Sequence, residues 1–209
     1  KVYVENDANA AAKGEAAYGA SKGCDNSVMI TLGTGLGGGV VTNGKLVTGF
    51  NYSGAELGHT VIEADGLQCS CGRRGCWEAY SSATGLIRQT KREMEANPSS
   101  LLWQVCGGDI NKVNGKTVFD ARDLGDESAQ KVIDNYYSYL ALGLTNIVNI
   151  FQPEILCIGG GICGQGEALR EPVEKLVMAE QYAKSTPNKT KIVIASLGND
   201  AGIIGAAML

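Results

Sequence analysis

The stretch of sequence that decides the fold is Val28-Met-Ile-Thr-Leu-Gly-Thr-Gly-Leu-Gly-Gly-Gly-Val-Val-Thr-Asn-Gly-Lys-Leu-Val47. Its apolar start, residues 28 to 32, is typical of a buried strand and runs into a glycine-rich segment, residues 33 to 39. Asn43-Gly44 then separates two further β-type runs, which is the strongest short signal for a hairpin. Residues 28 to 48 are therefore predicted to form an antiparallel meander of three strands.

Helices and strands are predicted to alternate outside this meander. Small side chains in residues 7 to 20 indicate a closely packed helix, and one apolar face predicts a long helix from Asp126 to Phe151. The other predicted elements are a helix over 77–96 that breaks near Gly85, a strand at 155–158, a helix near 166–183, a strand at 192–195 and a helix from Gly202. Residues 104 to 118 are polar and glycine-rich, and they predict no element. This order of elements is typical of an α/β fold with a mixed sheet.

Composition narrows the class of protein. The 209 residues are 44% hydrophobic and 19% charged, and no apolar run approaches the roughly 18 residues that a membrane helix needs. A net charge of -4 without a basic stripe argues against nucleic-acid binding by this segment. Seven cysteines, an odd number, favour a reducing compartment over a disulfide framework. We therefore expect a cytoplasmic protein that contacts neither membranes nor nucleic acid through this segment.

The only histidine and three of the seven cysteines are neighbours in the sequence. His59 is followed by Cys69-Ser-Cys71-Gly-Arg-Arg-Gly-Cys76, and Trp77-Glu78 comes next. One imidazole and three thiolates form the four-ligand N/S set that structural zinc prefers, whereas a catalytic zinc keeps one position open. A zinc deaminase would need His-x-Glu and Pro-Cys-x-x-Cys, and neither pattern occurs here. The segment therefore predicts a zinc ion that holds a loop.

Two segments fit the pattern Gly-x-Gly-x-x-Gly, at residues 33–38 and 159–164. The first runs into a hairpin, so it is not a dinucleotide fingerprint, but its amide N–H groups and the Thr34 hydroxyl can still face a phosphate. The second has the right order of elements, yet the acid expected for a ribose comes about twice too far along the chain. Either loop alone could be a packed turn. Together with Gly198-Asn-Asp-Ala-Gly202, they favour a nucleotide cleft.

A carboxylate stands at the start of the first predicted helix, in Glu5-Asn-Asp7-Ala-Asn-Ala10. Such a residue is either a partner of the helix N-terminus or a general base at the mouth of a cleft. This segment, the glycine-rich residues 32–39, Gly54-Ala-Glu-Leu-Gly-His59 and the cysteine segment together resemble the ROK family (repressor, open reading frame, kinase). Within the family the chain is most similar to the bacterial glucokinases, and the resemblance covers essentially the whole chain.

The resemblance implies an actin-like, ribonuclease H-type fold in which two domains close over a sugar and ATP. Residues 1–20 would be the end of an N-terminal small domain and a linking helix. Residues 21–199 would be the C-terminal large domain, with a zinc loop at 59–78. Residues 200–209 would start the final helix, which returns toward the small domain. The family also suggests a homodimer or homotetramer.

The resemblance further implies phosphorylation of a hexose at the 6-hydroxyl, most simply glucose to glucose 6-phosphate. Asp7 would be the catalytic base. The residues implied to bind the sugar are Asn6, Glu56, His59 and Glu78. Those implied to bind ATP, with Mg²⁺ on its phosphates, are Thr34, Gly35, Gly159, Gly160 and Gly161. Structural Zn²⁺ would be bound by His59, Cys69, Cys71 and Cys76, so that His59 serves both the metal and the sugar.

One departure from the family pattern bears on the expected activity of this chain. The chain starts at Lys1 and lacks the Asp-x-Gly-Gly-Thr phosphate loop expected at the start of the protein, so we expect a large-domain fragment that is inactive by itself. N-acetylmannosamine, N-acetylglucosamine and fructose remain alternative substrates. A sugar-responsive repressor of the same family would carry a helix-turn-helix domain upstream. A zinc-stabilised scaffold without catalysis would not need Asp7.

Overall fold

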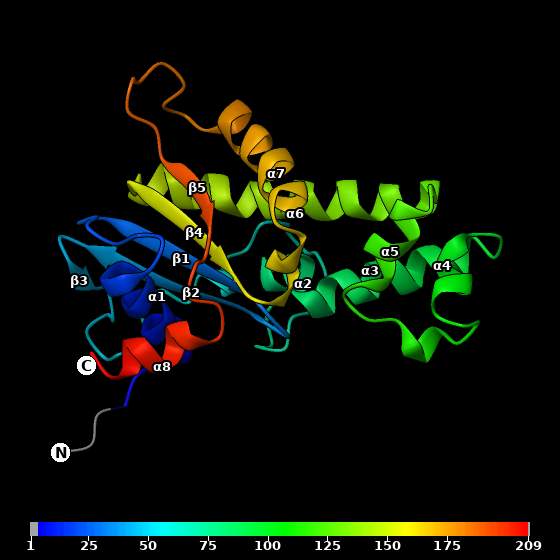
Figure 1. Cartoon of the computed structure of the whole chain (residues 1–209), viewed down its shortest axis with the longest axis horizontal. Coiled ribbons are helices and arrows are strands. Elements are labelled where there is room, and N and C mark those ends of the chain that lie inside the picture. Colours follow the sequence, from blue (N-terminus) through cyan, green and yellow to red (C-terminus); the bar gives the residue numbers. More distant parts are fainter. Residues whose placement is uncertain (1–3, 209) are drawn as a thin grey trace.

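A computed structural model describes residues 4–208 of the chain. These residues form an α/β protein (Figure 1). The helices are α1 (Asp7–Tyr18), α2 (Glu78–Ser81), α3 (Ala83–Ala96), α4 (Leu101–Val105), α5 (Thr117–Asp123), α6 (Glu127–Phe151), α7 (Glu167–Glu180) and α8 (Asp200–Ala206). The strands are β1 (Ser27–Leu32), β2 (Leu36–Thr42), β3 (Lys45–Leu46), β4 (Ile155–Gly159) and β5 (Lys191–Ile194). Short 3-10 turns occur at Leu57–His59, Ile110–Lys112 and Gly161–Gln165.

The strands form one five-stranded sheet in the order β3-β2-β1-β4-β5. Strand β2 is antiparallel to both β1 and β3, whereas β1, β4 and β5 are parallel to one another. Asn43 and Gly44 make the turn between β2 and β3 with φ of 51° and 72°, the left-handed backbone that an Asn-Gly turn requires. The expected α/β fold with a mixed sheet is confirmed.

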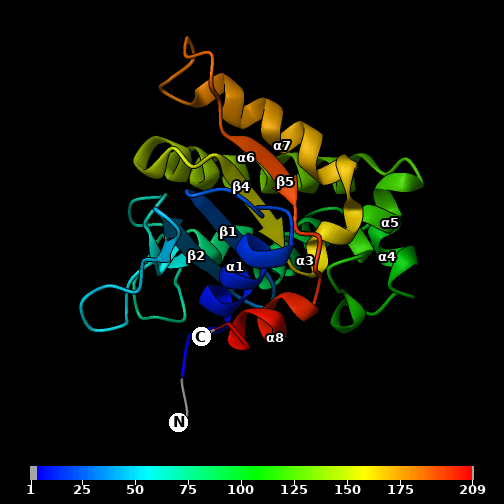
Figure 2. The same cartoon turned by 60° about the vertical axis from the view of Figure 1, so that its left-hand side comes forward.

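Helices cover both faces of the sheet (Figures 1 and 2). Successive side chains of a strand point to opposite faces. On β1, Val28, Ile30 and Leu32 belong to the main core with α6 and α7, while Met29 belongs to a smaller cluster with alanines of α1 and α8. The protein therefore has three layers, in which α1 and α8 lie on one face of the sheet and α6 and α7 on the other.

Helices α1 and α8 pack with their backbones almost in contact. A Cβ atom added to Gly14 of α1 would lie 2.2 Å from the Ala201 carbonyl oxygen, and one added to Gly205 of α8 would lie 1.6 Å from the Ala10 carbonyl oxygen. Both distances are far shorter than a van der Waals contact, so only glycine fits at either position. This close approach of the two backbones explains why α1 consists largely of small residues.

Two predictions about helices need correction. The segment 77–96 breaks at Ser82 and not near Gly85, because Ser82 is extended and its hydroxyl accepts a hydrogen bond from the Gly85 N–H at 3.0 Å. Ser82 is thus the N-cap of α3. Residues 104–118, for which the sequence predicts no element, contain the end of α4, a 3-10 turn and the start of α5.

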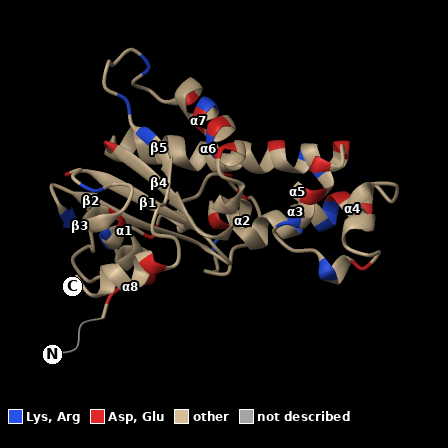
Figure 3. Cartoon of the chain, viewed as in Figure 1, with Lys and Arg blue, Asp and Glu red and all other residues tan. Residues whose placement is uncertain are grey.

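Charged side chains of both signs occur along α6 and α7 (Figure 3). On α7, Arg170 pairs with Glu167 one turn earlier and Glu174 one turn later. Ion pairs at a helix surface contribute little to stability, so the packing of α7 depends on its buried face of Leu169, Val173 and Val177. Among residues 4–208, no helix combines the length and the apolar character that crossing a bilayer requires.

Candidate functional site

One cleft collects most of the residues that the sequence singles out. It has a volume of about 550 Å³ and lies at the carboxyl ends of β1 and β4, between the start of α1 and the start of α8. Ligands of open α/β sheets bind at this edge of the parallel strands. The predicted site residues that line the cleft are Asn6, Asp7, Thr34, Gly35, Glu56, His59, Glu78 and Gly160, together with Gly198, Asn199 and Gly202.

Volume alone does not single out this cleft. A larger hollow of about 960 Å³ lies around Cys24, Glu154 and Lys191, at the amino end of the parallel strands. The Glu154 carboxylate in this hollow accepts the N–H groups of Asp25 and Asn26, both at 3.0 Å, so its visible role is to close a loop. The smaller cleft is the better candidate because several unlike functional groups converge on it.

The start of α1 presents two polar side chains to the cleft. Asn6 is the N-cap of α1, and its Oδ1 accepts hydrogen bonds from the N–H groups of Ala8 at 2.9 Å and Asn9 at 3.3 Å. Asp7 follows in the first helical turn, where the helix dipole favours its negative charge, and it is exposed to solvent. Asn6 is therefore the cap of α1, and Asp7 Oδ1 also accepts the Ala8 N–H, at 2.8 Å, so that the other carboxylate oxygen of Asp7 has no hydrogen-bond partner among the described residues.

Glu56 and His59 reach the cleft through a tight turn. The turn lies against β2, since a Cβ atom at Gly58 would be 2.0 Å from the Leu36 carbonyl oxygen, and Leu57 packs over Gly38. Leu57 and Gly58 are buried, and the residues on either side line the cleft. The buried Leu57 and Gly58 thus fix the turn against β2, and the side chains of Glu56 and His59 on either side of them reach the cleft.

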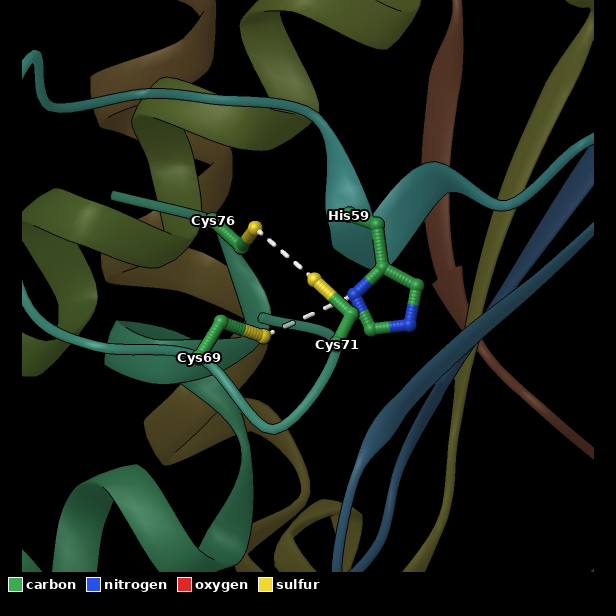
Figure 4. Close-up of side chains that lie close together, drawn as sticks. All are labelled: His59, Cys69, Cys71 and Cys76. Atoms are coloured by element: carbon green, nitrogen blue, oxygen red, sulfur yellow. Dashed lines mark hydrogen bonds between the residues drawn. The ribbon is translucent and has the colours of Figure 1, made fainter. Parts of the chain in front are cut away.

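His59, Cys69, Cys71 and Cys76 form one cluster (Figure 4), whose potential ligand atoms all lie within 4.8 Å of one another. The Sγ atoms of Cys71 and Cys76 are 3.7 Å apart, and Cys69 Sγ lies 3.6 Å from His59 Nδ1. Zn–S bonds of about 2.3 Å in a tetrahedron place two sulfurs about 3.8 Å apart, so these spacings fit a zinc ion. Figure 4 shows the second ring nitrogen of His59 directed away from the sulfurs.

The thiols of the cluster differ in acidity. Burial, followed by the neighbouring sulfurs, raises the pKa of Cys76 to about 12. A hydrogen bond with the backbone of Arg73 is the main cause that lowers the pKa of the exposed Cys71. Because the thiolate is the form that binds a metal, a cation held by all four residues would have to displace a proton from Cys76 at neutral pH.

The loop that carries the cysteines is anchored on both sides of Cys76, its last cysteine. Gly75 has φ of 78°, and a Cβ atom there would lie 1.7 Å from the Glu63 carbonyl oxygen. Trp77 is fully buried, donates its Nε1–H to the Tyr139 carbonyl oxygen of α6 at 3.1 Å, and covers Gly143, where a Cβ atom would lie 1.9 Å from the indole. The loop is therefore attached to the core next to its last cysteine.

Glu78 connects this loop with the glycine turn between β1 and β2. One carboxylate oxygen accepts the Leu36 N–H at 2.9 Å, and the other accepts the Ser70 hydroxyl at 3.2 Å. A Cβ atom at Gly35 would lie 2.5 Å from the first oxygen. Thr34 is held from the other side, because its carbonyl oxygen accepts the Thr84 hydroxyl at 2.7 Å. Glycine at position 35 therefore leaves the room that the Glu78 carboxylate occupies.

The three glycines after β4 occupy unlike places. Gly160 lines the cleft with φ of 97°, and a Cβ atom there would lie 2.4 Å from the Leu32 carbonyl oxygen. Gly161 lines a second hollow beside it, of about 290 Å³. Gly159 is buried in the sheet, where a Cβ atom would meet the Met29 methyl group at 2.8 Å. Of these glycines, Gly159 thus contributes to packing and lines neither space.

The second hollow includes residues that sequence reasoning missed. Asn114, Gly115 and Lys116 lie there with Thr34 and Gly161, next to the cleft. They belong to the segment that predicts no element, because a short polar turn has no periodic pattern. The pair Asn114-Gly115 is a turn signal in the sequence, but it does not indicate that the turn faces a glycine loop far away along the chain.

Comparison with known proteins agrees with this arrangement. The model of the ROK family matches residues 1–209. A glucokinase from Thermotoga maritima is 44% identical over 209 residues, which are 100% of this chain and 65% of that protein. The xylose repressor of Bacillus subtilis is 31% identical over 210 residues, covering 100% of this chain and 50% of the repressor. A crystal structure of a ROK family glucokinase from Streptomyces griseus in complex with glucose and AMPPNP has a TM-score of 0.90 at 37% identity, and the match covers 99% of this chain and 67% of that one.

Proposed function

The chain belongs to the ROK family, and we propose that the full-length protein is a sugar kinase. It would transfer the γ-phosphoryl group of ATP to the 6-hydroxyl of a hexose, with glucose as the first candidate. The glucokinases of Thermotoga maritima and Streptomyces griseus support this proposal. Because the chain spans 65% of the Thermotoga enzyme's length, the activity is proposed for the full-length protein and not for this chain alone.

The observation that carries the proposal is that a single cleft is lined by two kinds of group. Carboxylates, an amide and an imidazole, which suit sugar hydroxyls, lie with glycine-rich backbone, which suits phosphates. Asp7 stands among them at the start of a helix. A kinase needs these features together, since phosphoryl transfer depends mainly on positioning and on charge.

Asp7 is proposed as the general base. Its carboxylate accepts the proton of the sugar 6-hydroxyl as that oxygen forms a bond to the γ-phosphorus. The bond between the γ-phosphorus and the oxygen that bridges to the β-phosphate breaks, and ADP leaves with the electron pair. Asp7 lies in the first turn of α1 and is exposed to the cleft, where a sugar hydroxyl can reach its carboxylate.

Sugar recognition is proposed for Asn6, Glu56, His59 and Glu78. Because the Asn6 Oδ1 caps α1, its amide NH₂ is the group left to donate to a hydroxyl. Glu78 already accepts a backbone N–H with one oxygen and a serine hydroxyl with the other, so it would receive sugar hydroxyls on the remaining lone pairs. A sugar that lacks the matching hydroxyl would leave buried polar groups unpaired, which disfavours its binding.

Nucleotide binding is proposed for the glycine loops. Thr34, Gly35 and Gly160 offer a hydroxyl and backbone that a phosphate can approach closely, and Mg²⁺ would accompany the phosphates. The hollow lined by Gly161, Asn114 and Lys116 opens beside Thr34 and would receive the nucleoside end of ATP. Gly159 is not included, because its place is inside the sheet.

A zinc ion is proposed to hold His59 and Glu78, two of the proposed sugar-binding residues, in place; this role is called the zinc clamp. His59, Cys69, Cys71 and Cys76 fit a zinc ion in donor type and spacing. With all four positions taken, the ion would fix the His59 ring and leave its second nitrogen for the sugar. The clamp would also steady Glu78, whose carboxylate accepts the Ser70 hydroxyl from within the same loop.

An ADP-release assay of the full-length protein tests this function. The sugar panel contains glucose, fructose, N-acetylmannosamine and N-acetylglucosamine, and Asp7→Ala is the matched control. ATP-dependent turnover of one sugar that the Asp7→Ala variant lacks is expected, with glucose turned over fastest. The present chain assayed alone is expected to be inactive. No turnover of any sugar would contradict the kinase proposal.

A sugar-responsive repressor is the second candidate function. The 31% identity to the xylose repressor over 210 residues favours this function, since that repressor contains a segment similar to the whole of this chain. A repressor is expected to bind sugar without turnover in the same assay, and the full-length protein would then shift a DNA fragment of its own promoter in a sugar-dependent manner. A kinase is expected to show turnover and no shift.

A further inference from the structure

Glu15 is a fully buried carboxylate for which the proposed function has no role so far. It lies on α1, two helical turns after Asp7, with 0% of its surface exposed. Its Oε2 accepts the Ala20 N–H at 2.6 Å and both the N–H and the hydroxyl of Ser196 at 3.3 Å, and its Oε1 accepts the Leu197 N–H at 2.8 Å. One side chain thus ties α1 to the segment between β5 and α8.

The surroundings of Glu15 are shaped for this contact. A Cβ atom at Gly19 would lie 2.0 Å from Glu15 Oε2, so a side chain there would displace the carboxylate. The preceding residue, Gly14, meets the Ala201 carbonyl of α8. Gly14, Glu15 and Gly19 therefore share one purpose, which is to hold the β5–α8 segment directly against α1.

A carboxylate is the side chain that this place requires. Burying a charge is costly unless hydrogen bonds compensate for it, and here four donors do so. Glutamine has one acceptor oxygen, so its NH₂ group would face a backbone N–H, and an apolar residue would leave these donors unpaired. Packing alone would be served better by an apolar side chain, since replacing a buried ionic group by apolar residues is often neutral or stabilising.

The two segments that Glu15 joins both line the cleft. The start of α1 carries Asp7, and the segment after Leu197 continues into Gly198 and Asn199. Gly198 and Asn199 belong to the glycine-containing segments that favour a nucleotide cleft, and they are called its nucleotide side here. Building on the proposed function, we infer that Glu15 is a positioning residue that holds this nucleotide side in register with the catalytic base. It touches neither substrate, and it acts through Ser196 and Leu197.

The first test is hydrogen exchange of the full-length protein, followed by mass spectrometry. In Glu15→Gln, faster exchange is expected in peptides that cover residues 195–201, with no change in the cysteine loop. Glu95→Gln removes the same charge from an exposed helix position and serves as the control. Ser196→Ala removes one donor and is expected to give a smaller change in the same peptides. Unchanged exchange in Glu15→Gln would overturn the inference.

The second test separates the two substrates. Titration with AMPPNP and Mg²⁺ is expected to show about 10-fold weaker nucleotide binding in Glu15→Gln, the loss that roughly one unpaired donor would cause. A separate titration with glucose is expected to show unchanged glucose binding. In a kinase assay of Glu15→Gln, KM for ATP is expected to rise and KM for the sugar is expected to remain unchanged. Equal losses for both ligands with a lower melting temperature would reveal a merely structural role and overturn the inference.

The two proposals fail separately. If the unmodified full-length protein turns over no sugar, the kinase proposal fails, while exchange and AMPPNP titration still decide the role of Glu15. If the unmodified protein is an active kinase and Glu15→Gln retains its nucleotide affinity and its exchange pattern, only the role of Glu15 fails.

Discussion

The two sides of the cleft are held in place by different means. On the side of His59 and Glu78, a loop folds around four soft ligand groups and is attached to the core by one buried tryptophan. On the side of Asp7 and Gly198, two helices touch through their backbones at glycines, and a buried carboxylate closes the contact. The loop side depends on groups that an ion can bring together, whereas the helix side depends on the absence of side chains. We therefore expect changes at the cluster to affect mainly the loop, and changes at the helix contact to affect the stability of the fold.

Asp7→Ala is expected to have the largest effect on activity. Loss of a general base costs about 10²–10⁴-fold in rate, so kcat should fall by that range while both KM values stay within a few-fold. The melting temperature should fall only slightly, since Asn6 provides the cap of α1 and Asp7 contributes one hydrogen bond, to the Ala8 N–H, beside it. Steady-state kinetics and thermal unfolding of the full-length protein measure both. An unchanged kcat would mean that Asp7 is not the general base.

Cys71→Ser tests the loop side. It removes an exposed ligand of the cluster, so zinc content should fall below one ion per chain and KM for the sugar should rise, by about 10–100-fold if the ion orients His59. KM for ATP should stay the same, because the glycine loops are held independently. Metal analysis and kinetics are compared with Cys24→Ser, a thiol outside the cluster. A zinc-free variant with unchanged sugar KM would refute the clamp.

Gly205→Ala tests the helix side. The new methyl group would overlap the Ala10 carbonyl, and such overpacking destabilises by about 1–3 kcal/mol. Gly202→Ala is the control, since a Cβ atom there meets no heavy atom within 4 Å and the change in helix propensity is the same. Chemical unfolding should rank Gly205→Ala below Gly202→Ala in free energy of unfolding. Equal stability would mean that the two helices can move apart without cost.

Trp77→Phe should have the smallest effect. It removes the hydrogen bond to the Tyr139 carbonyl, worth about 1 kcal/mol, and keeps most of the apolar contact with Gly143. A small decrease in stability and a sugar KM within a few-fold of the original are expected. Unfolding and kinetics measure the two effects. A change in KM for ATP instead would show that the two sides of the cleft are coupled through α6.

Much of this architecture can be predicted because its signals are local. The Asn43-Gly44 turn needs positive φ at both positions, which the residue types themselves indicate. The metal cluster is predictable because three of its four ligands lie within eight residues of one another. The sequence predicts the helix break near Gly85 because glycine disfavours a helix interior, whereas the break lies at Ser82, whose hydroxyl accepts the Gly85 N–H and caps α3.

Residue type and short spacing are enough to predict the family, the strands and the longer helices, and the donor groups of the cluster, but not the short helices α4 and α5. Only the tertiary structure decided that Gly35 leaves room for Glu78, that Gly159 belongs to the sheet, and that Glu15 holds a segment 181 residues away. The physical reason is that close approach is a property of two surfaces. A glycine or a buried carboxylate shows in the sequence that something must come near, but the partner is set by how the helices and strands pack.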